Sequence, residues 1–339
     1  MIFFYIYLLL VILLSFALKK KGVFLNYSGD FHQTFSNKKN VPLSGGLFIL
    51  IPTVFFIKDV FVSCFIISIY LVGFFSDRKV LVSPKIRFLI QCILILLFVV
   101  IFDLKINSSR VEIFDILLNN KVFAFFFSAF CLLILINGSN FIDGLNGLLI
   151  SFTIVIFFML NKLNLIDNSI ISYESVNLII LLLLIVLLLN IFNVLMLGDS
   201  GAYLLGFLIG LTIINSHISN PDISPYFFIS LIWYPCFENL FSILRKIKRD
   251  FSPLKPDHKH LHQLIFFLLT KRYNLKLIVS NNLSSGIICF FNFLIIYIAT
   301  LNPSSTIFQI KLIAFSIIFY NVSYIILFNS YKSNLVSKK

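Results

Sequence analysis

The stretch "NGSNFIDGLNGLL" places polar and flexible residues between two strongly apolar runs. Asn137, Asn140, Asp143 and Asn146 recur at every third position. At about 100° per residue, these steps spread the four side chains over half of a helix circumference, which a lipid-facing helix cannot tolerate. The intervening glycines let the backbone break and approach a ligand closely. The stretch therefore indicates a polar site at the end of a membrane crossing, although a helix that simply ends in turn residues is the alternative.

Other carboxylates also lie at or near the ends of apolar runs, at Asp77, Asp199 and Glu238. An aspartate at the centre of a membrane helix costs roughly 2.5 to 3.5 kcal/mol, so these groups should face protein or water. Carboxylates beside a basic surface suit Mg²⁺, which usually takes one or two of them and leaves its other positions to phosphate and water. Helix capping is an equally good explanation for any single aspartate.

The segment "LGDSGAYLLGF" begins with a Gly-Asp-Ser-Gly turn and continues directly into an apolar run. Backbone N–H groups at such a helix start can face a phosphate, and Asp199 can hold its metal. Serine hydrolases use the same letters, but no histidine and aspartate pair accompanies Ser200 here. We therefore discount Ser200 as a nucleophile.

The segment "RKIKRDFSPLKPDHKHLHQL" at 245–264 joins basic residues to three histidines. Cations such as Arg245 and Lys255 can clamp a diphosphate, and His260 and His262 can position or protonate it. A basic loop after a crossing is also ordinary in membrane proteins. Zinc is not favoured, because no cysteine or HExxH helix accompanies the histidines.

Composition identifies the environment of these groups. Of the 339 residues, 59% are hydrophobic and 12% are charged, which fits an integral membrane protein and not a soluble fold. The net charge of +13 does not indicate nucleic-acid binding, because the basic residues are dispersed among the crossings. We expect one polytopic unit over 1–339, an all-α bundle of about 11 transmembrane helices. The apolar runs lie at about 1–18, 44–57, 60–75, 86–102, 122–137, 148–161, 176–194, 202–215, 226–244, 277–300 and 307–328.

The basic residues also predict the orientation. If Lys19 is cytoplasmic, its face carries all but six of the 27 Lys and Arg residues, so the positive-inside rule places the N-terminus outside and the C-terminus in the cytoplasm. Every polar segment described above then emerges on the cytoplasmic face, which predicts one assembled cleft. The expected cytoplasmic loops lie at about 19–43, 76–85, 137–147, 195–201 and 245–276.

In order, the chain carries "PLSGG", "GFFSDRKVLVSPKIRFLIQ", "NGSNFIDGLNGLL", "GDSGAYLLG" and "PDHKHLHQ". This series resembles the polyprenyl-phosphate N-acetylhexosamine-1-phosphate transferases, glycosyltransferase family 4. The resemblance implies transfer of a sugar 1-phosphate from a UDP-sugar, such as UDP-GlcNAc, to undecaprenyl phosphate with release of UMP. It also implies Mg²⁺, or Mn²⁺ in its place, in a bacterial cytoplasmic membrane, where the product starts an envelope glycan such as O-antigen. No nucleic-acid partner is expected, and a homodimer is compatible with the pattern.

Roles follow from the resemblance by matching position. Asp199 resembles the principal metal ligand, Asp143 with Asn140 the catalytic floor, and Asp77 the group that acts on the acceptor phosphate. The remaining matches are expected to contact substrate. They are the uracil-proximal Leu145 and Asn146, the diphosphate-proximal His260 and His262, and Lys38, Ser76, Asn137, Arg245 and Lys255.

Three positions depart from the family pattern. Ser76 replaces the first aspartate of an Asp-Asp pair, Asn146 the second aspartate of DGxDG, and Gln263 the last histidine of HxHH. A prenyl phosphate is already largely ionised at neutral pH, so a dedicated base is dispensable and we expect activity. A transporter or flippase of lipid-linked sugars is the main rival, but no internal repeat is visible. A catalytically inactive relative acting as a scaffold is the other alternative.

Overall fold

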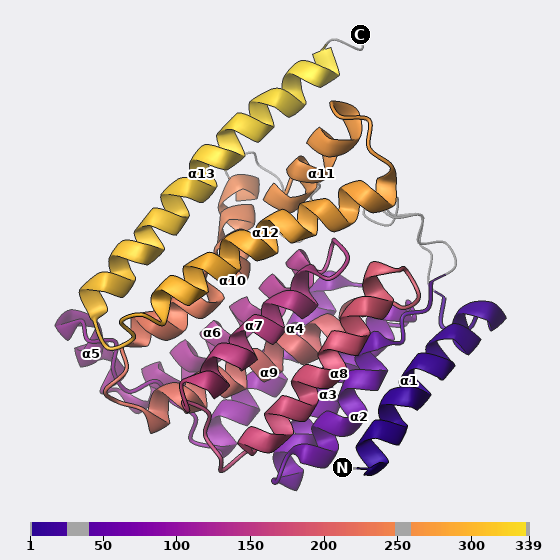
Figure 1. Ribbon diagram of the computed structural model, residues 1–339. Coiled ribbons are helices and arrows are strands. Elements are labelled where there is room, and N and C mark those ends of the chain that lie inside the picture. Colours follow the sequence, from indigo (N-terminus) through magenta and orange to yellow (C-terminus); the bar gives the residue numbers. More distant parts are fainter. Residues whose placement is uncertain (1, 26–40, 248–258, 337–339) are drawn as a thin grey trace.

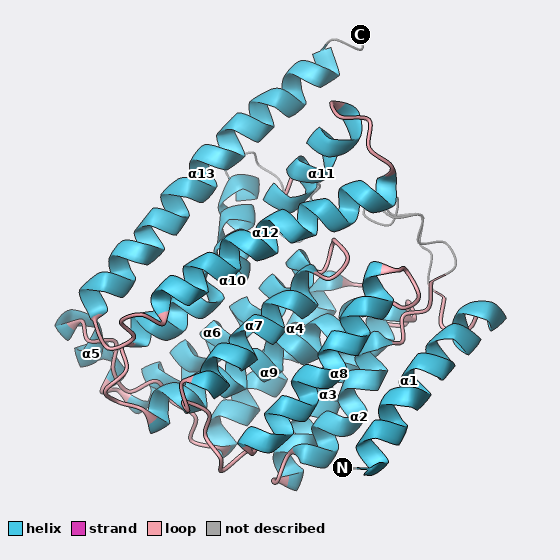
Figure 2. Cartoon of the chain, viewed as in Figure 1, coloured by secondary structure: helices cyan, strands magenta, loops and turns pink. Residues whose placement is uncertain are grey.

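A computed structural model describes residues 2–25, 41–247 and 259–336, and within these ranges every regular element is a helix (Figures 1 and 2). The helices are α1 (Ile2–Lys21), α2 (Gly45–Phe56), α3 (Val60–Asp77), α4 (Pro84–Ile101), α5 (Glu112–Leu118), α6 (Lys121–Ile142), α7 (Leu148–Lys162), α8 (Tyr173–Ile191), α9 (Gly198–Ser219), α10 (Pro225–Ile247), α11 (Leu261–Lys271), α12 (Leu277–Ala299) and α13 (Thr306–Val336).

The predicted all-helical membrane bundle is confirmed. Each of the eleven apolar runs coincides with a helix, and in the described part of the chain nine helices are long and apolar enough to cross a membrane. The two other runs form α2 and α7, which have 12 and 15 residues. The segment 245–276, expected to be a loop, is helical over Leu261–Lys271, where it forms α11.

Several helices begin where a polar side chain satisfies their first N–H groups. Asp59 accepts hydrogen bonds from the first turn of α3, Asn120 from that of α6, and Ser172 from that of α8. Such caps are worth about 1 kcal/mol each and matter most where little water is present. They fix where the chain re-enters the bundle.

Helix α9 is the central element of the bundle, because 78% of its most apolar window is buried, against 17–56% for the other long helices. Glycines on its neighbours allow this close packing. A Cβ on Gly73 of α3 would lie 2.4 Å from Ser200 Cα, and one on Gly46 of α2 would lie 2.6 Å from the Gly201 nitrogen. Small residues at such contacts are the usual means of helix association in membranes. Glycines of α2 and α3 therefore set how closely these two helices approach α9.

Large apolar side chains point outward from the bundle. Helix α1 exposes Phe3 at 87%, and the α12 and α13 surfaces expose Phe290 and Ile307 at 65% and 70%. In water such surfaces would drive association, whereas lipid tails solvate them. Figure 1 shows α12 and α13 as long neighbouring helices of the C-terminal half, with α11 close to both.

The close approach of α3 to α9 generates a stability prediction. Gly73→Ala should destabilise the bundle by about 1–3 kcal/mol, because the added methyl group overlaps the α9 backbone. Gly286→Ala on α12 is the matched control, since nothing lies within 4 Å of its added Cβ. Thermal unfolding in detergent should show a lower Tm for the first variant alone. Equal Tm values for both variants would contradict the packing described here.

Candidate active site

The start of α9 is held by a carboxylate from α3. Asp77 accepts hydrogen bonds from the backbone nitrogens of Asp199 at 2.9 Å and Ser200 at 3.1 Å. Gly198 precedes them with φ +73°, and a Cβ there would lie 2.6 Å from an Asp77 oxygen, so the approach requires glycine. Asp77 therefore caps α9, which is the alternative to a catalytic role that the sequence left open.

Asp199 extends from this capped turn toward α4. Its Oδ2 accepts from the Ser76 hydroxyl at 2.6 Å and from Arg87 Nη1 at 2.7 Å, and Arg87 also contacts Ser76. The Asp199 and Arg87 side chains are 28% and 21% exposed, so solvent can reach this ion pair. Ser76, Asp77, Arg87 and Asp199 form what we call the carboxylate cluster.

Arg87 was not among the residues expected to form the site. It lies in "SPKIR" within one of the five motifs, one turn before Gln91 of α4. Gln91 in turn accepts from Asn137 Nδ2 at 3.2 Å, which links α4 to the polar end of α6. A basic residue just inside an apolar helix next to an aspartate motif was the available signal.

The polar residues at and after the end of α6 lie in two different environments. Helix α6 continues to Ile142, so Asn137 and Asn140 are helical, and both of them and Asp143 are half-buried. Asn146 instead is 2% exposed and faces other amides: its backbone nitrogen donates to Asn281 Oδ1, and its Nδ2 donates to Asn193 Oδ1, both at 2.8 Å. The replacement of an acid by asparagine at this position therefore comes with a neutral amide network.

The histidines form a second group with α10 and α13, which we call the histidine cluster. His260 Nδ1 lies 2.8 Å from Glu238 Oε1, and the rings of His260 and His262 stack with their centroids 5.5 Å apart. His262 is fully buried, and neither ring nitrogen has a partner among the described residues. Burial, with the nearby His260, lowers the pKa of His262 to about 3, so this ring is neutral at physiological pH.

The α6–α7 turn and Gln263 hold this cluster in place. A Cβ on Gly144 would lie 2.9 Å from His262 Nε2, so glycine there lets the ring approach the turn. Gln263, which departs from the HxHH pattern, accepts from the His260 backbone nitrogen at 3.2 Å and helps to cap α11. Phe141 completes the contact, with its ring centroid 5.4 Å from that of His260.

Other predicted residues are placed differently. Leu145 is buried at 1% exposure, and Arg245 donates to the Lys259 carbonyl oxygen and the Tyr324 hydroxyl. Lys38 and Lys255 lie outside the described residues. The candidate site comprises the carboxylate cluster, linked to α6 through Gln91, and the histidine cluster, which packs against Phe141.

Among the described residues, no three His, Cys, Asp or Glu side chains gather as metal ligands. Asp199 nevertheless fits Mg²⁺, because its Oδ1 bonds to no described residue and Mg²⁺ needs few protein ligands. Asp77 is less suited, since both of its oxygens accept backbone N–H groups.

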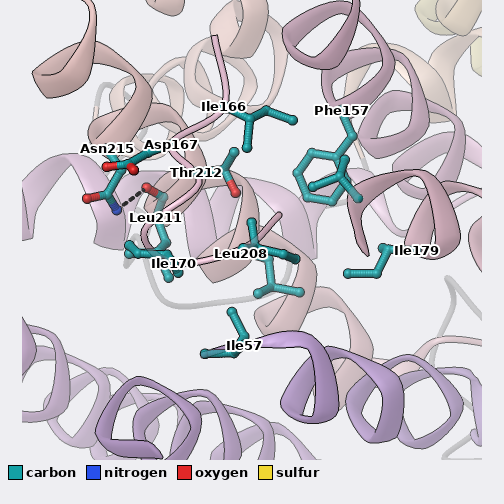
Figure 3. A pocket seen from close by; sticks show the side chains of 12 residues that line it. Ile57, Phe157, Ile166, Asp167, Ile170, Ile179, Leu208, Leu211, Thr212 and Asn215 are labelled. Atoms are coloured by element: carbon teal, nitrogen blue, oxygen red, sulfur yellow. Dashed lines mark hydrogen bonds between the residues drawn. The ribbon is translucent and has the colours of Figure 1, made fainter. Parts of the chain in front are cut away.

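A separate pocket lies near the other end of α9. It is lined mainly by apolar side chains, including Phe157, Ile166 and Leu208, with Asn215 and Asp167 at one side (Figure 3). Asn215 is sixteen residues from Asp199 on the same helix, which separates them by about 24 Å at 1.5 Å per residue. This pocket is therefore not part of the candidate site.

The fold and the candidate site define a polytopic membrane protein with an acidic turn at the start of α9 and a histidine cluster. The family model described as glycosyl transferase family 4 matches residues 60–217, which include the carboxylate cluster and the α6 motif. The matched residues make up a little less than half of the chain, and the match agrees with the family that the motifs resemble.

Similar proteins carry names that fit this family. The chain is similar to the undecaprenyl-phosphate alpha-N-acetylglucosaminyl 1-phosphate transferases of Salmonella typhi (27% identity, 66% of this chain and 65% of the relative) and Escherichia coli strain K12 (26%, 56% and 53%). The Thermotoga maritima protein of that name is 25% identical over 73% of this chain and 76% of its own. The match thus spans 65% or less of the two enterobacterial proteins.

The amide network generates a prediction for Asn146→Asp, which would restore the family's acid. The variant should lose about 1–3 kcal/mol of stability at neutral pH, because a buried carboxylate cannot donate to Asn193. Asn161→Asp is the control, since Asn161 makes the same kind of bond to Asn177 at an exposed site. Unfolding in detergent measures both variants. A stable Asn146→Asp protein would show that the amide donor is unimportant.

Proposed function

We propose that the protein transfers a sugar 1-phosphate, N-acetylhexosamine 1-phosphate by preference, from a UDP-sugar to undecaprenyl phosphate. The observation that carries the proposal is the carboxylate cluster, in which Asp199 stands at a capped helix start beside Arg87. A helix start, a metal-binding carboxylate and a cation are what phosphoryl transfer needs, because it depends on positioning and charge neutralisation. The names of the relatives support the choice of acceptor.

In the proposed reaction, an oxygen of the acceptor phosphate attacks the β-phosphorus of the donor. The bond from that phosphorus to the bridging oxygen breaks, and UMP leaves with the oxygen. The attacking phosphate is already ionised, so no proton has to be removed. This explains how a chain with Ser76 in place of an aspartate can carry out the step.

Each group of the candidate site has its own role in this proposal. Mg²⁺ held by Asp199 would neutralise diphosphate charge when bound. Arg87, which pairs with Asp199, would contact a phosphate oxygen of the substrate if that carboxylate held a metal. Asn140 and Asp143 line the end of α6 between the two clusters, and the histidine cluster can donate to the diphosphate.

The membrane setting belongs to the same proposal. The lipid phosphate is confined to the bilayer and the nucleotide is made in the cytosol, so we place the site at the cytoplasmic face of the bacterial inner membrane. The basic surplus on the Lys19 face supports this orientation. The product would then start a lipid-linked envelope glycan.

The direct test is UMP release by the purified protein with undecaprenyl phosphate, Mg²⁺ and a panel of UDP-N-acetylhexosamines. We expect release with at least one donor, and only when the acceptor is present. Bound UDP without release from any donor would reject the transferase and favour an inactive scaffold.

Asp199→Asn should lower kcat at least 100-fold, because an amide binds Mg²⁺ weakly and pairs poorly with Arg87. Asp222→Asn, in the loop before α10, is the matched control and should retain full activity. The measurement is UMP release at saturating substrates. Comparable rates in the two variants would remove Asp199 from the metal site.

Arg87→Gln should separate metal binding from turnover. Without the guanidinium, Mg²⁺ should half-saturate the enzyme at a lower concentration, while kcat falls about 10- to 100-fold through loss of a phosphate contact. Lys79→Gln removes an exposed charge nearby and serves as control. Magnesium titrations of UMP release decide the matter, and an unchanged or higher magnesium requirement in Arg87→Gln would contradict competition for Asp199.

A further inference from the structure

The histidine cluster contains a buried carboxylate, Glu238, that the proposed reaction does not use. Glu238 of α10 has no exposed surface, and both of its oxygens are engaged. Oε1 lies 2.8 Å from His260 Nδ1, and Oε2 accepts from the Tyr320 hydroxyl of α13 at 2.9 Å. Placing a carboxylate in a membrane helix is costly, and well-packed apolar side chains would stabilise the bundle as well or better. Stability alone therefore does not account for Glu238.

The contact defines which nitrogen of His260 carries a proton. A carboxylate oxygen only accepts, so Nδ1 must donate to it, and Nε2 is the nitrogen left to meet another group. The ring is also fixed on its faces, because it stacks on His262 with an interplanar angle of 11° and packs against Phe141. The Gln263 side chain holds the backbone of the same residue. His260 is thus oriented from several sides.

We propose that Glu238, held by Tyr320, is a positioning residue that orients His260 so that its Nε2 meets the diphosphate of the donor. The inference rests on the proposed transferase function for the identity of that diphosphate. The orientation of the ring itself does not depend on it. Carboxylates that orient a functional histidine through its other nitrogen act in the same way at metal and catalytic sites.

A double-mutant experiment tests whether Glu238 acts through His260. Glu238→Gln keeps the side-chain volume but removes the charge, so kcat for UMP release should fall about 10- to 100-fold with little change in KM for the donor. His260→Gln should cost at least as much. The double variant should be no slower than His260→Gln alone, because Glu238 has nothing left to orient. If the loss of kcat in the double variant equals the product of the two single losses, the proposal is overturned.

Two further variants separate positioning from folding. Tyr320→Phe removes one hydrogen bond to Glu238 and should lower kcat severalfold while the protein elutes and melts normally. Ser316→Ala removes a buried hydroxyl one turn earlier on α13, where it bonds only to the Leu312 carbonyl oxygen, and should leave kcat unchanged. Equal activity of the two variants would show that the Tyr320 bond does not position anything.

A spectroscopic readout is independent of activity. The chain has five histidines, so ¹⁵N-histidine labelling gives few signals, and the one lost in His260→Gln identifies the residue. We expect a protonated Nδ1 in the wild-type signal and a displaced signal in Glu238→Gln. An unmoved signal would overturn the positioning role. Wild-type protein that shows the expected signal but releases no UMP would reject only the proposed function.

Discussion

The site depends on the hydrogen bonds between the Asp77 carboxylate and the first backbone N–H groups of α9. Those groups have no partner within the helix, and in a membrane bundle little water is present to satisfy them. By accepting two of them, Asp77 fixes the end of α3 to the start of α9. The same contact requires glycine at 198 and leaves the Asp199 side chain to pair with Ser76 and Arg87.

The packing of α6 against α9 positions the other polar groups of the candidate site. Helix α6 contacts α9 closely enough that Gly206 of α9 leaves no room for a Cβ, which would lie 2.8 Å from Ile136 Cα. The polar end of α6 therefore lies between the carboxylate cluster and the histidine cluster. In the proposed function, the carboxylate cluster would hold a metal and neutralise charge, and the histidine cluster would supply an oriented ring nitrogen. A reaction that moves a phosphoryl group between two anions would use both.

The sequence predicted the fold well because apolar runs report helices directly. All eleven runs became helices, and the ordered motifs resemble the family whose model matches residues 60–217. Helix α11 was missed because its 11 residues are too few for a crossing and follow a basic stretch. The end of α6 was expected to be a loop, but its asparagines are compatible with helix and bond to neighbours such as Gln91.

Site contacts were less predictable, because they join residues far apart in the chain. The pairing of Glu238 with His260 and Tyr320, and of Arg87 with Asp199, appears only when helices pack. Asn146 is an example. Its place in the motif predicted a contact with substrate, yet its side chain takes part in a network of buried amides.

In the proposed function, the carboxylate cluster and the histidine cluster bind the same diphosphate. A cryo-EM structure with UDP and Mg²⁺ tests this most directly: we predict the metal on Asp199 and the diphosphate between it and His260, and a nucleotide bound away from either cluster would contradict it.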